Sequence, residues 1–346
     1  MASSFQMETA EHLFRVSPLS APKGATPPEP ASRSVKARFG AVTHPGRVRL
    51  RNEDHYMVAR VRRAMHPLAH NLPQGELAES IGEDAYAMVV ADGMGGMNAG
   101  DVASMLAIST GVRLVDKSPK WGFKINQKEA KELLERMSEY FREIDLRLTR
   151  TSEQDRRLFG MGTTLTLAYS VGLHLFLIHV GDSRAYLYRR GQLRQLTRDH
   201  TVAQALADAG TIPQDSVRKH ARRNTLTNYL GGQRGRVQAD VRWLRLEDGD
   251  RILVCSDGLT DMVLDPEIAR SLAGHEEPGA AALELLQKAL DGGGRDNITI
   301  VVARYAVLPE GNSDAALEET QEIVRTEFLE QTVDRERLLG GEFSQG

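Results

Sequence analysis

Apolar residues recur along most of the chain in short runs, and this pattern predicts β-strands. The run at 85–91 is almost continuous and stops at Asp92–Gly93, which indicates a buried strand. Later runs follow one another across short turns at Gly172 and Gly181, so we expect hairpins and antiparallel pairing. The strands expected on this basis cover residues 37–43, 55–61, 85–91, 163–171, 173–180, 185–189, 192–196, 240–246, 251–255 and 298–305.

Helical spacing of the apolar residues marks other segments as helices. Residues 99–115 and 127–149 form a first pair, and further helices are expected near 201–209, 266–272 and 280–290. Hairpins interrupted by paired helices exclude the regular strand–helix alternation of a doubly wound parallel sheet. The sequence therefore predicts an α+β fold in which an antiparallel β-sandwich is flanked by helix pairs.

Two segments interrupt or precede this pattern. Residues 1–36 are rich in Ser, Pro, Ala and Gly and show no lasting apolar period, so we expect a disordered leader. Residues 62–84 contain Pro67 and Pro73, and we expect a long inserted loop there. The folded domain is expected at 37–308.

The tail at 309–346 differs from the domain in charge. Residues 306–346 hold ten acidic and three basic residues, a net charge of −7. Some apolar residues within 315–339 have roughly helical spacing. A short amphipathic helix and a solvated acidic tail both remain open.

Composition narrows the class of protein. The chain has 346 residues, one cysteine, Cys255, and a net charge of −3. One cysteine permits neither an internal disulfide nor a cysteine cage for zinc, so a cytoplasmic location is the default expectation. No apolar stretch is long enough for a membrane span, and the N-terminus lacks the layout of a signal peptide. With no basic stripe either, we expect neither a membrane nor a nucleic acid as partner.

Short polar motifs occur where apolar strands stop, and most of them place an Asp beside a Gly. Carboxylates at the edge of a sheet, with glycines that admit a close backbone, suit hard octahedral cations such as Mg²⁺ or Mn²⁺. Any one such motif alone is more typical of a turn, but five in one chain favour a metal site. The motifs are Asn52–Asp54, Ala91–Gly96, Gly181–Arg184, Ser256–Gly258 and Gly294–Asn297.

In this order and spacing the motifs resemble those of the type 2C, metal-dependent protein Ser/Thr phosphatases, the PPM family, in its bacterial branch. The resemblance extends over about residues 37–305. It implies a four-layer αββα fold, in agreement with the fold predicted from periodicity. Further motifs that share the likeness are Gly160–Thr164, Leu196–His200 and Asn224–Thr227.

The resemblance implies a set of metal ligands. Asp92 matches the carboxylate that bridges two ions, and Gly93 matches the residue that lends a backbone carbonyl to the first. Asp257 and Asp296 match ligands of the second ion. Asp182 matches a residue that joins Asp257 around a third, weaker ion. The implied cofactor is therefore Mn²⁺ or Mg²⁺, with two core ions and a third.

The same resemblance implies three residues around these ligands. Arg49 matches the arginine that holds the substrate phosphate, a role that suits a planar guanidinium with two parallel donors. Glu53 and Asp54 match acids that orient metal-bound waters.

The implied activity is hydrolysis of phosphoserine and phosphothreonine in proteins by direct attack of a hydroxide that bridges the two ions. The implied setting is bacterial signalling, with phosphorylated proteins as substrates and a Ser/Thr kinase as counterpart. A cysteine nucleophile is excluded, because the position six residues after Cys255 holds Asp261 instead of Arg. A phosphatase-like binding module without turnover stays as the alternative, although the filled ligand positions favour catalysis.

Three positions depart from the family pattern or stay open. Met94 stands where some members have a histidine, and Met cannot donate a proton to the leaving group. His200 is either the acid that donates this proton or a residue that stabilises a turn. Asn228 replaces an arginine common in bacterial members, so its role is in doubt. Asn228 belongs to residues 201–232, the expected flap region, whose basic residues suit an acidic peptide or form a solvated face.

Overall fold

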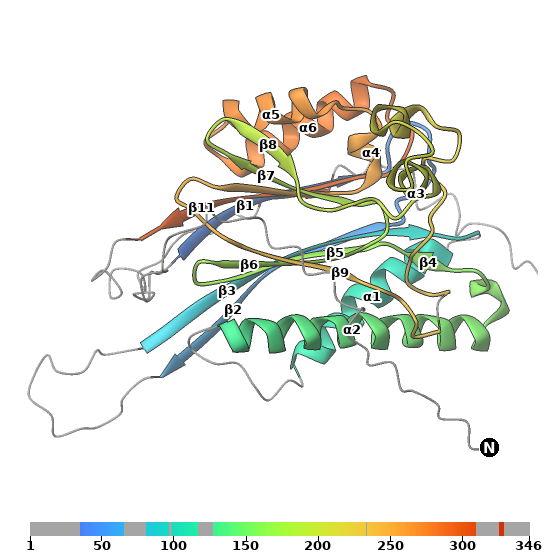
Figure 1. Cartoon of the computed structure of the whole chain (residues 1–346), viewed down its shortest axis with the longest axis horizontal. Coiled ribbons are helices and arrows are strands. Elements are labelled where there is room, and N and C mark those ends of the chain that lie inside the picture. The colour runs from blue at the N-terminus through green and yellow to red at the C-terminus, as the bar shows by residue number, and fades with distance from the viewer. Residues whose placement is uncertain are drawn as a thin grey trace, which may run out of the picture.

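Two β-sheets form the centre of the structure, and a helix pair covers the outer face of each (Figure 1). This computed structural model describes residues 35–65, 81–96, 99–116, 127–232, 234–308 and 325–328. From top to bottom, Figure 1 shows one helix pair, a first sheet, a second sheet and the other helix pair. The predicted α+β sandwich flanked by helix pairs is thus confirmed.

Sheet A has the strand order β12-β1-β11-β10-β7-β8. Its neighbouring strands pair antiparallel, except that β12 runs parallel to β1. A Cβ at Gly40 of β1 would overlap the backbone at Pro278 and Gly279, so this glycine lets helix α6 lie directly on the sheet. The elements of this half are β1 (Val35–His44), β7 (Arg184–Arg189), β8 (Gln192–Gln195), β10 (Arg251–Cys255), β11 (Ile298–Val307), β12 (Arg325–Phe328), α5 (Asp265–Gly274) and α6 (Pro278–Asp291).

Sheet B has the strand order β2-β3-β5-β6-β9, and the short strand β4 pairs with the end of β3. Helices α1 and α2 cover its outer face. None of the helices in the described segments is both long and apolar enough to cross a membrane. The elements of this half are β2 (Asp54–Met65), β3 (Ile81–Met94), β4 (Gly162–Thr163), β5 (Leu165–Val171), β6 (His174–Val180), β9 (Asp240–Arg245), α1 (Ala99–Asp116) and α2 (Gln127–Gln154).

Four short helical segments complete the described chain. The 3₁₀ turn η1 (Arg156–Leu158) follows α2, and α4 (Asp257–Thr260) follows β10. The expected flap region, 201–232, contains α3 (Val202–Asp208) and the 3₁₀ turn η2 (Gln214–Lys219). These segments lie at one end of the sandwich (Figure 1).

The apolar runs of the sequence become strands that are buried on both faces. In β3, Met88 and Val90 face the core between the two sheets, whereas Ala87 and Val89 face α1 and α2. In β10 the same division places Leu253 under the helix pair α5 and α6. Three apolar layers result. A strand between two of these layers is buried on both faces, so its sequence does not alternate between apolar and polar residues.

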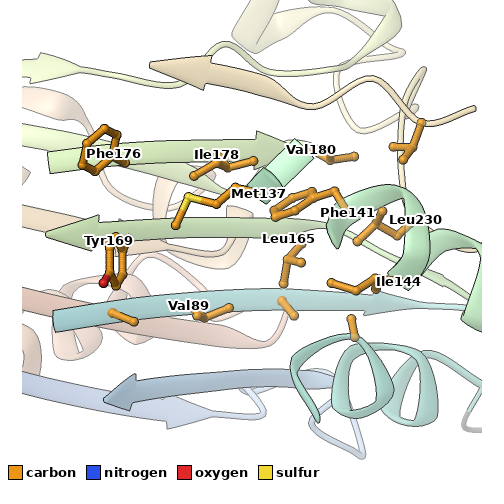
Figure 2. Close-up of a cluster of buried hydrophobic side chains, with 14 of the residues drawn as sticks. Val89, Met137, Phe141, Ile144, Leu165, Tyr169, Phe176, Ile178, Val180 and Leu230 are labelled. Carbon is orange, nitrogen blue, oxygen red and sulfur yellow. The ribbon is translucent and has the colours of Figure 1, made fainter. Parts of the chain in front are cut away.

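The layer between sheet B and the helices α1 and α2 is shown in Figure 2. Met137, Phe141 and Ile144 of α2 lie against side chains of β3, β5 and β6. Their spacing of three and four residues puts all three on one face of the helix. The strong helical period of 127–149 is therefore confirmed, and the helix runs a little further, to Gln154.

The predicted inserted loop at 62–84 is wrong at both ends. Strand β2 continues to Met65 and β3 begins at Ile81, so the two strands form a longer hairpin than expected. Arg62 and Asp84 are paired across this hairpin, with Nε and Nη2 of the guanidinium donating to the carboxylate at 2.8 and 2.9 Å. Residues 66–80, which include the prolines behind the prediction, lie outside the described residues.

Two boundary predictions also need correction. Strand β1 begins at Val35, inside the expected leader, while residues 1–34 lie outside the described part of the chain. In the acidic tail, Arg325–Phe328 is a strand paired with β1 and not a helix. The rest of the tail, apart from these four residues, lies outside the described residues.

Candidate active site

The polar motifs meet at one end of the sandwich because antiparallel pairing brings strand ends together. Asp54 at the start of β2 is the direct partner of Asp92 near the end of β3. Likewise, His44 at the end of β1 is the partner of Ile298 at the start of β11. Loops that follow or precede these strand ends therefore share one edge.

The backbone around Asp92 is held by two threonines, Thr163 of β4 and Thr164 directly after it. Asp92 N donates to Thr164 Oγ1 at 3.0 Å, and Thr163 Oγ1 donates to the Asp92 carbonyl at 2.9 Å. At the next residue, a Cβ on Gly93 would overlap the carbonyl oxygen of Gly100 in α1. The glycine is therefore required by the close approach of α1, and the Asp92 carboxylate projects from a fixed backbone.

Asp54 is buried and only half satisfied. Its Oδ2 accepts a hydrogen bond from Ser256 Oγ at 2.7 Å, while Oδ1 is buried with no hydrogen-bond partner. Burial raises the pKa of Asp54 to about 6, although the hydrogen bond from Ser256 opposes this shift. An orphaned carboxylate oxygen at this place is an acceptor that a water or a cation can use.

Glu53 lies against the first turn of α1. Its carboxylate accepts a hydrogen bond from the backbone N–H of Asp101, and a Cβ at Gly100 would lie 2.9 Å from it. The Glu53 carbonyl also accepts from Ser104 Oγ at 2.6 Å. Helix α1 thus holds Glu53 through its N-terminal amide groups, where a negative charge is favoured.

Arg49 and Asp296 form an ion pair within the same group of side chains. Arg49 Nη2 donates to Asp296 Oδ2 at 2.7 Å, and this bond raises the pKa of the guanidinium. The next residue, Asn297, accepts from Glu53 N at 2.8 Å and donates to the Arg51 carbonyl at 2.7 Å. The asparagine therefore ties the loop that carries Arg49 to the start of β11.

Asp182 and Asp257 complete the group. Asp182 lies in the turn between β6 and β7, and Asp257 begins the one-turn helix α4. Burial raises the pKa of Asp182 to about 7, with a further contribution from Asp199. Burial, followed by the charge of Asp182, also raises the pKa of Asp257 well above its ordinary value.

Asp92 stands at the centre of this arrangement. Burial and the negative charges of four neighbouring aspartates all raise its pKa. Those neighbours are Asp54, Asp182, Asp257 and Asp296. Because like charges this close repel, the group needs a cation if all its carboxylates are to be ionised at neutral pH.

The donor set fits divalent cations that keep part of their water. Within the described segments, no three His, Cys, Asp or Glu side chains are arranged to enclose an ion by themselves. Mg²⁺ and similar ions are commonly held by one or two carboxylates, with a carbonyl and waters completing the octahedron. Such a site agrees with the orphaned oxygen of Asp54 and with the mutual repulsion of the aspartates.

Known proteins resemble this chain in sequence. The sequence profile described as Protein phosphatase 2C matches residues 74–290, which is more than half of the chain. The chain belongs to the protein phosphatase 2C family. The serine/threonine protein phosphatase PstP of Mycobacterium tuberculosis is 38% identical over 225 residues, 65% of this chain and 41% of that protein. The serine/threonine phosphatase stp of Listeria monocytogenes is 35% identical over 242 residues, 70% of this chain and 93% of that protein.

Solved phosphatase 2C structures share the fold. The catalytic domain of the serine/threonine protein phosphatase PstP in complex with two manganese ions is 33% identical, with a TM-score of 0.61, and covers 79% of this chain and 100% of that one. The family resemblance and the fold class predicted from the sequence are thereby confirmed. The chain spans less than half the length of the first mycobacterial relative, which is 41% covered.

Several residues of this phosphatase 2C site received no role from the sequence. Ser256 links Asp54 to β11, because its Oγ also accepts from Thr299 N at 3.0 Å. Thr164 and Ser104 position Asp92 and Glu53 as described above. The motifs that contain Ser256 and Thr164 are visible in the sequence, but their hydrogen bonds join segments far apart along the chain.

The structure supports one of the two interpretations of His200, that it stabilises a turn. Its Nδ1 accepts a hydrogen bond from Gly181 N at 3.1 Å, so it supports the turn that carries Asp182. Met94 pairs with Gly162 of β4 and packs there. Neither side chain is therefore assigned as the acid for the leaving group.

We expect the phosphatase 2C chain in EDTA to lose stability as the pH rises. The pKa values of Asp54 and Asp182 are raised to about 6 and about 7, so the native state holds more protons than the unfolded chain between about pH 4 and pH 7. The free energy of unfolding should therefore decrease across this range. Urea titrations of the wild type and of Asp182→Asn test this: the variant should show a smaller decrease, and identical pH profiles would contradict it.

Proposed function

We propose that the chain is a metal-dependent protein phosphatase that hydrolyses phosphoserine and phosphothreonine. The observation that carries the proposal is the group of mutually repelling aspartates around Asp92, with the guanidinium of Arg49 bound to one of them, Asp296. A phosphate ester binds where cationic charge converges, and this site offers one arginine together with a place for cations. Membership in the protein phosphatase 2C family supports the same activity.

The cations that suit the site are Mn²⁺ and Mg²⁺. Asp92 and the Gly93 carbonyl are proposed to hold the first ion, and Asp257 and Asp296 the second, with Asp92 between them. Asp182 is proposed to share a third, weaker ion with Asp257. When bound, paired divalent ions lower the pKa of water and offset charge on the phosphoryl oxygens. Support comes from the raised pKa values of Asp92 and Asp257, which a cation would return to the ionised range.

Arg49 is proposed to bind the phosphate of the substrate. The guanidinium is more than half exposed and already reaches across to Asp296. Once positive charge offsets that carboxylate, the Arg49 donors can turn to two phosphate oxygens in the bidentate geometry that guanidinium groups favour. Glu53 and Asp54 carry acceptor oxygens beside the group and are proposed to orient water.

We place the enzyme in the cytoplasm, where it would act on phosphorylated proteins and oppose a Ser/Thr kinase. The lone cysteine, Cys255, is buried in β10 and its pKa is raised by burial, so it is neither a disulfide partner nor a reactive thiol. A reducing compartment suits such a chain.

Phosphate release from a phosphothreonine peptide tests this function. With Mn²⁺ we expect continuous turnover, and with EDTA we expect none. The alternative, a binding module without turnover, predicts that the peptide binds in the presence of Mn²⁺ while no phosphate appears. Binding without release would therefore overturn the proposal in favour of that alternative.

Asp182→Ala should lower the rate on a phosphothreonine peptide far more than the rate on p-nitrophenyl phosphate. A threonine alkoxide is a poor leaving group and needs an acid, whereas p-nitrophenolate leaves with little help. If Asp182 and Asp257 hold a third cation, that cation would lower the pKa of water there and so supply the acidity that Met94 cannot. Rates on both substrates across a Mn²⁺ titration measure the effect, with Glu143→Ala, on the exposed side of α2, as the control carboxylate deletion. An equal loss on both substrates would remove the leaving-group role from Asp182.

A further inference from the structure

His200 joins three segments that are distant in the sequence. Its backbone N–H donates to the Gly181 carbonyl at 2.7 Å, and its carbonyl accepts from Thr227 N at 2.8 Å. Its ring contacts the side chain of Asp240 at the start of β9, with 3.3 Å between Nε2 and Oδ2. The residue therefore connects the turn that carries Asp182, the expected flap region and sheet B.

The hydrogen bonds fix the tautomer of the ring. Gly181 N donates to Nδ1 at 3.1 Å, so Nδ1 must present its lone pair. The proton then belongs to Nε2, which faces the carboxylate of Asp240. A carboxylate in this place holds the imidazole in one orientation, as in other sites where a second acceptor fixes a histidine.

Asn228, which lies in the expected flap region, contacts the same ring nitrogen, His200 Nδ1. Its Nδ2 lies 3.2 Å from His200 Nδ1 and donates to the Gln238 carbonyl at 2.6 Å. Asn228, the residue that departs from the family pattern, therefore has His200 and the Gln238 carbonyl as partners. The Nδ1 lone pair is the meeting point of the Gly181 turn and the segment that follows the flap.

Gly181 leaves the turn little room to shift. Its φ of +110° is in the region that favours glycine, and a Cβ there would lie 2.5 Å from Thr164 Cβ. Thr164 is the residue that also accepts from Asp92 N. The turn is thus held between Thr164 on one side and His200 on the other, with Asp182 as the next residue.

We propose that His200 is a positioning residue that fixes the Gly181–Asp182 turn through its Nδ1 and couples that turn to residues 225–228 of the flap region through Asn228. The part of this inference that concerns metal binding by Asp182 rests on the proposed function. The part that concerns the turn rests on the hydrogen bonds alone. Loss of the Nδ1 acceptor leaves the Gly181 N–H unpaired and releases the Asp182 carboxylate from its fixed direction.

Two isosteric substitutions separate positioning from simple packing. In His200→Asn the amide oxygen replaces Nδ1 and can still accept from Gly181, while the contact with Asp240 is lost. In His200→Gln the side chain fills more of the space and reaches toward Asp240, but offers no acceptor at the Nδ1 position. If His200 acts through Nδ1, Asn preserves the turn and Gln does not; if it acts by filling space, Gln is the milder change.

Hydrogen–deuterium exchange of the Gly181 amide in the full chain is the first measurement. We expect exchange close to the wild-type rate in His200→Asn and at least about tenfold faster exchange in His200→Gln, because one hydrogen bond of roughly 1.4 kcal/mol corresponds to tenfold. This readout does not depend on catalysis, so it holds even if the proposed activity is absent. Faster exchange in Asn than in Gln would overturn the proposal.

Calorimetric titration with Mn²⁺ is the second measurement. His200→Gln should weaken the lowest-affinity site by about tenfold or more and leave the tighter binding steps unchanged, since a partner behind a ligand typically changes metal affinity by that amount. Asn228→Ala should shift the same site in the same direction, and the effects of His200→Gln and Asn228→Ala should not be additive, because both act at one nitrogen. Equal weakening of every step, or full additivity, would contradict the coupling.

Discussion

Asp92→Asn should lower kcat/KM for a phosphothreonine peptide by about 100-fold or more at saturating Mn²⁺, because the charge stabilisation supplied by a paired-metal site is worth several kcal/mol. Burial, followed by the charges of four other aspartates, raises the pKa of this carboxylate. An amide in its place keeps the shape but would hold divalent cations less strongly than a carboxylate. The backbone bonds to Thr163 and Thr164 do not involve the carboxylate, so the variant should fold.

The control for this loss is the stability of the same variant in EDTA. Removing one charge from a repelling group should raise the melting temperature at pH 8 or leave it unchanged, because Asp92 contributes repulsion without a cation. Glu143→Gln, on the exposed side of α2, should change neither property. A variant that keeps more than about a tenth of the wild-type rate would show that Asp92 is not a bridging ligand.

Arg49→Ala should lower kcat/KM for the phosphopeptide by about 10- to 100-fold, mainly through KM, because hydrogen bonds to charged groups are worth roughly 1.5–3 kcal/mol. The guanidinium donates to the Asp296 carboxylate, and its exposed position leaves other donors accessible to a substrate. Arg49→Lys is the matched variant, since it keeps the charge and loses the bidentate geometry.

The two variants give a graded expectation. Arg49→Lys should recover part of the loss, and both variants should retain the Mn²⁺ affinity of the wild type within a few fold. Unchanged steady-state constants in Arg49→Ala would remove this residue from the substrate site. A large change in Mn²⁺ affinity with unchanged KM would instead show that Arg49 acts only through its ion pair with Asp296 and does not bind the substrate.

The fold could be predicted because its buried strands appear in the sequence as runs of apolar residues. The run at 85–91 is apolar throughout, since alternate residues of β3 serve two different cores. Short glycine-containing turns then required antiparallel neighbours, which the pairing of β5 with β6 confirms. The periodicity of 127–149 gave the helix that packs on this sheet.

The errors in the predicted strand boundaries have local causes. The ends of the β2–β3 hairpin carry charged residues such as Arg62 and Asp84, which look like loop residues until their cross-strand pairing is seen. Strand β12 is only four residues long, Arg325–Phe328, and its one apolar residue, Phe328, is too little to show the alternation that would predict a strand. Backbone pairing at a sheet edge depends little on side chains.

The candidate site also has a part that the sequence predicts and a part that it does not. Asp92, Asp182 and Asp257 stand next to glycines, and all five aspartates were predicted from their motifs and from the family resemblance. Their supporting partners were not, because Ser256 and Asp54 are separated by 202 positions and Asp92 and Thr164 by 72. Such hydrogen bonds follow from tertiary pairing and leave no local pattern. Likewise, the role of His200 emerges only when Gly181, Asp240 and Asn228 are seen around one ring.

The central claim is that the group of aspartates around Asp92 binds a pair of divalent cations. An anomalous difference map from crystals soaked in MnCl₂ tests it most directly. The account predicts two strong peaks, one at Asp92 and the Gly93 carbonyl and one at Asp257 and Asp296, each within about 2.0–2.6 Å of a carboxylate oxygen. A map with no peak within coordination distance of Asp92, or with peaks only at other carboxylates on the surface, would contradict the account.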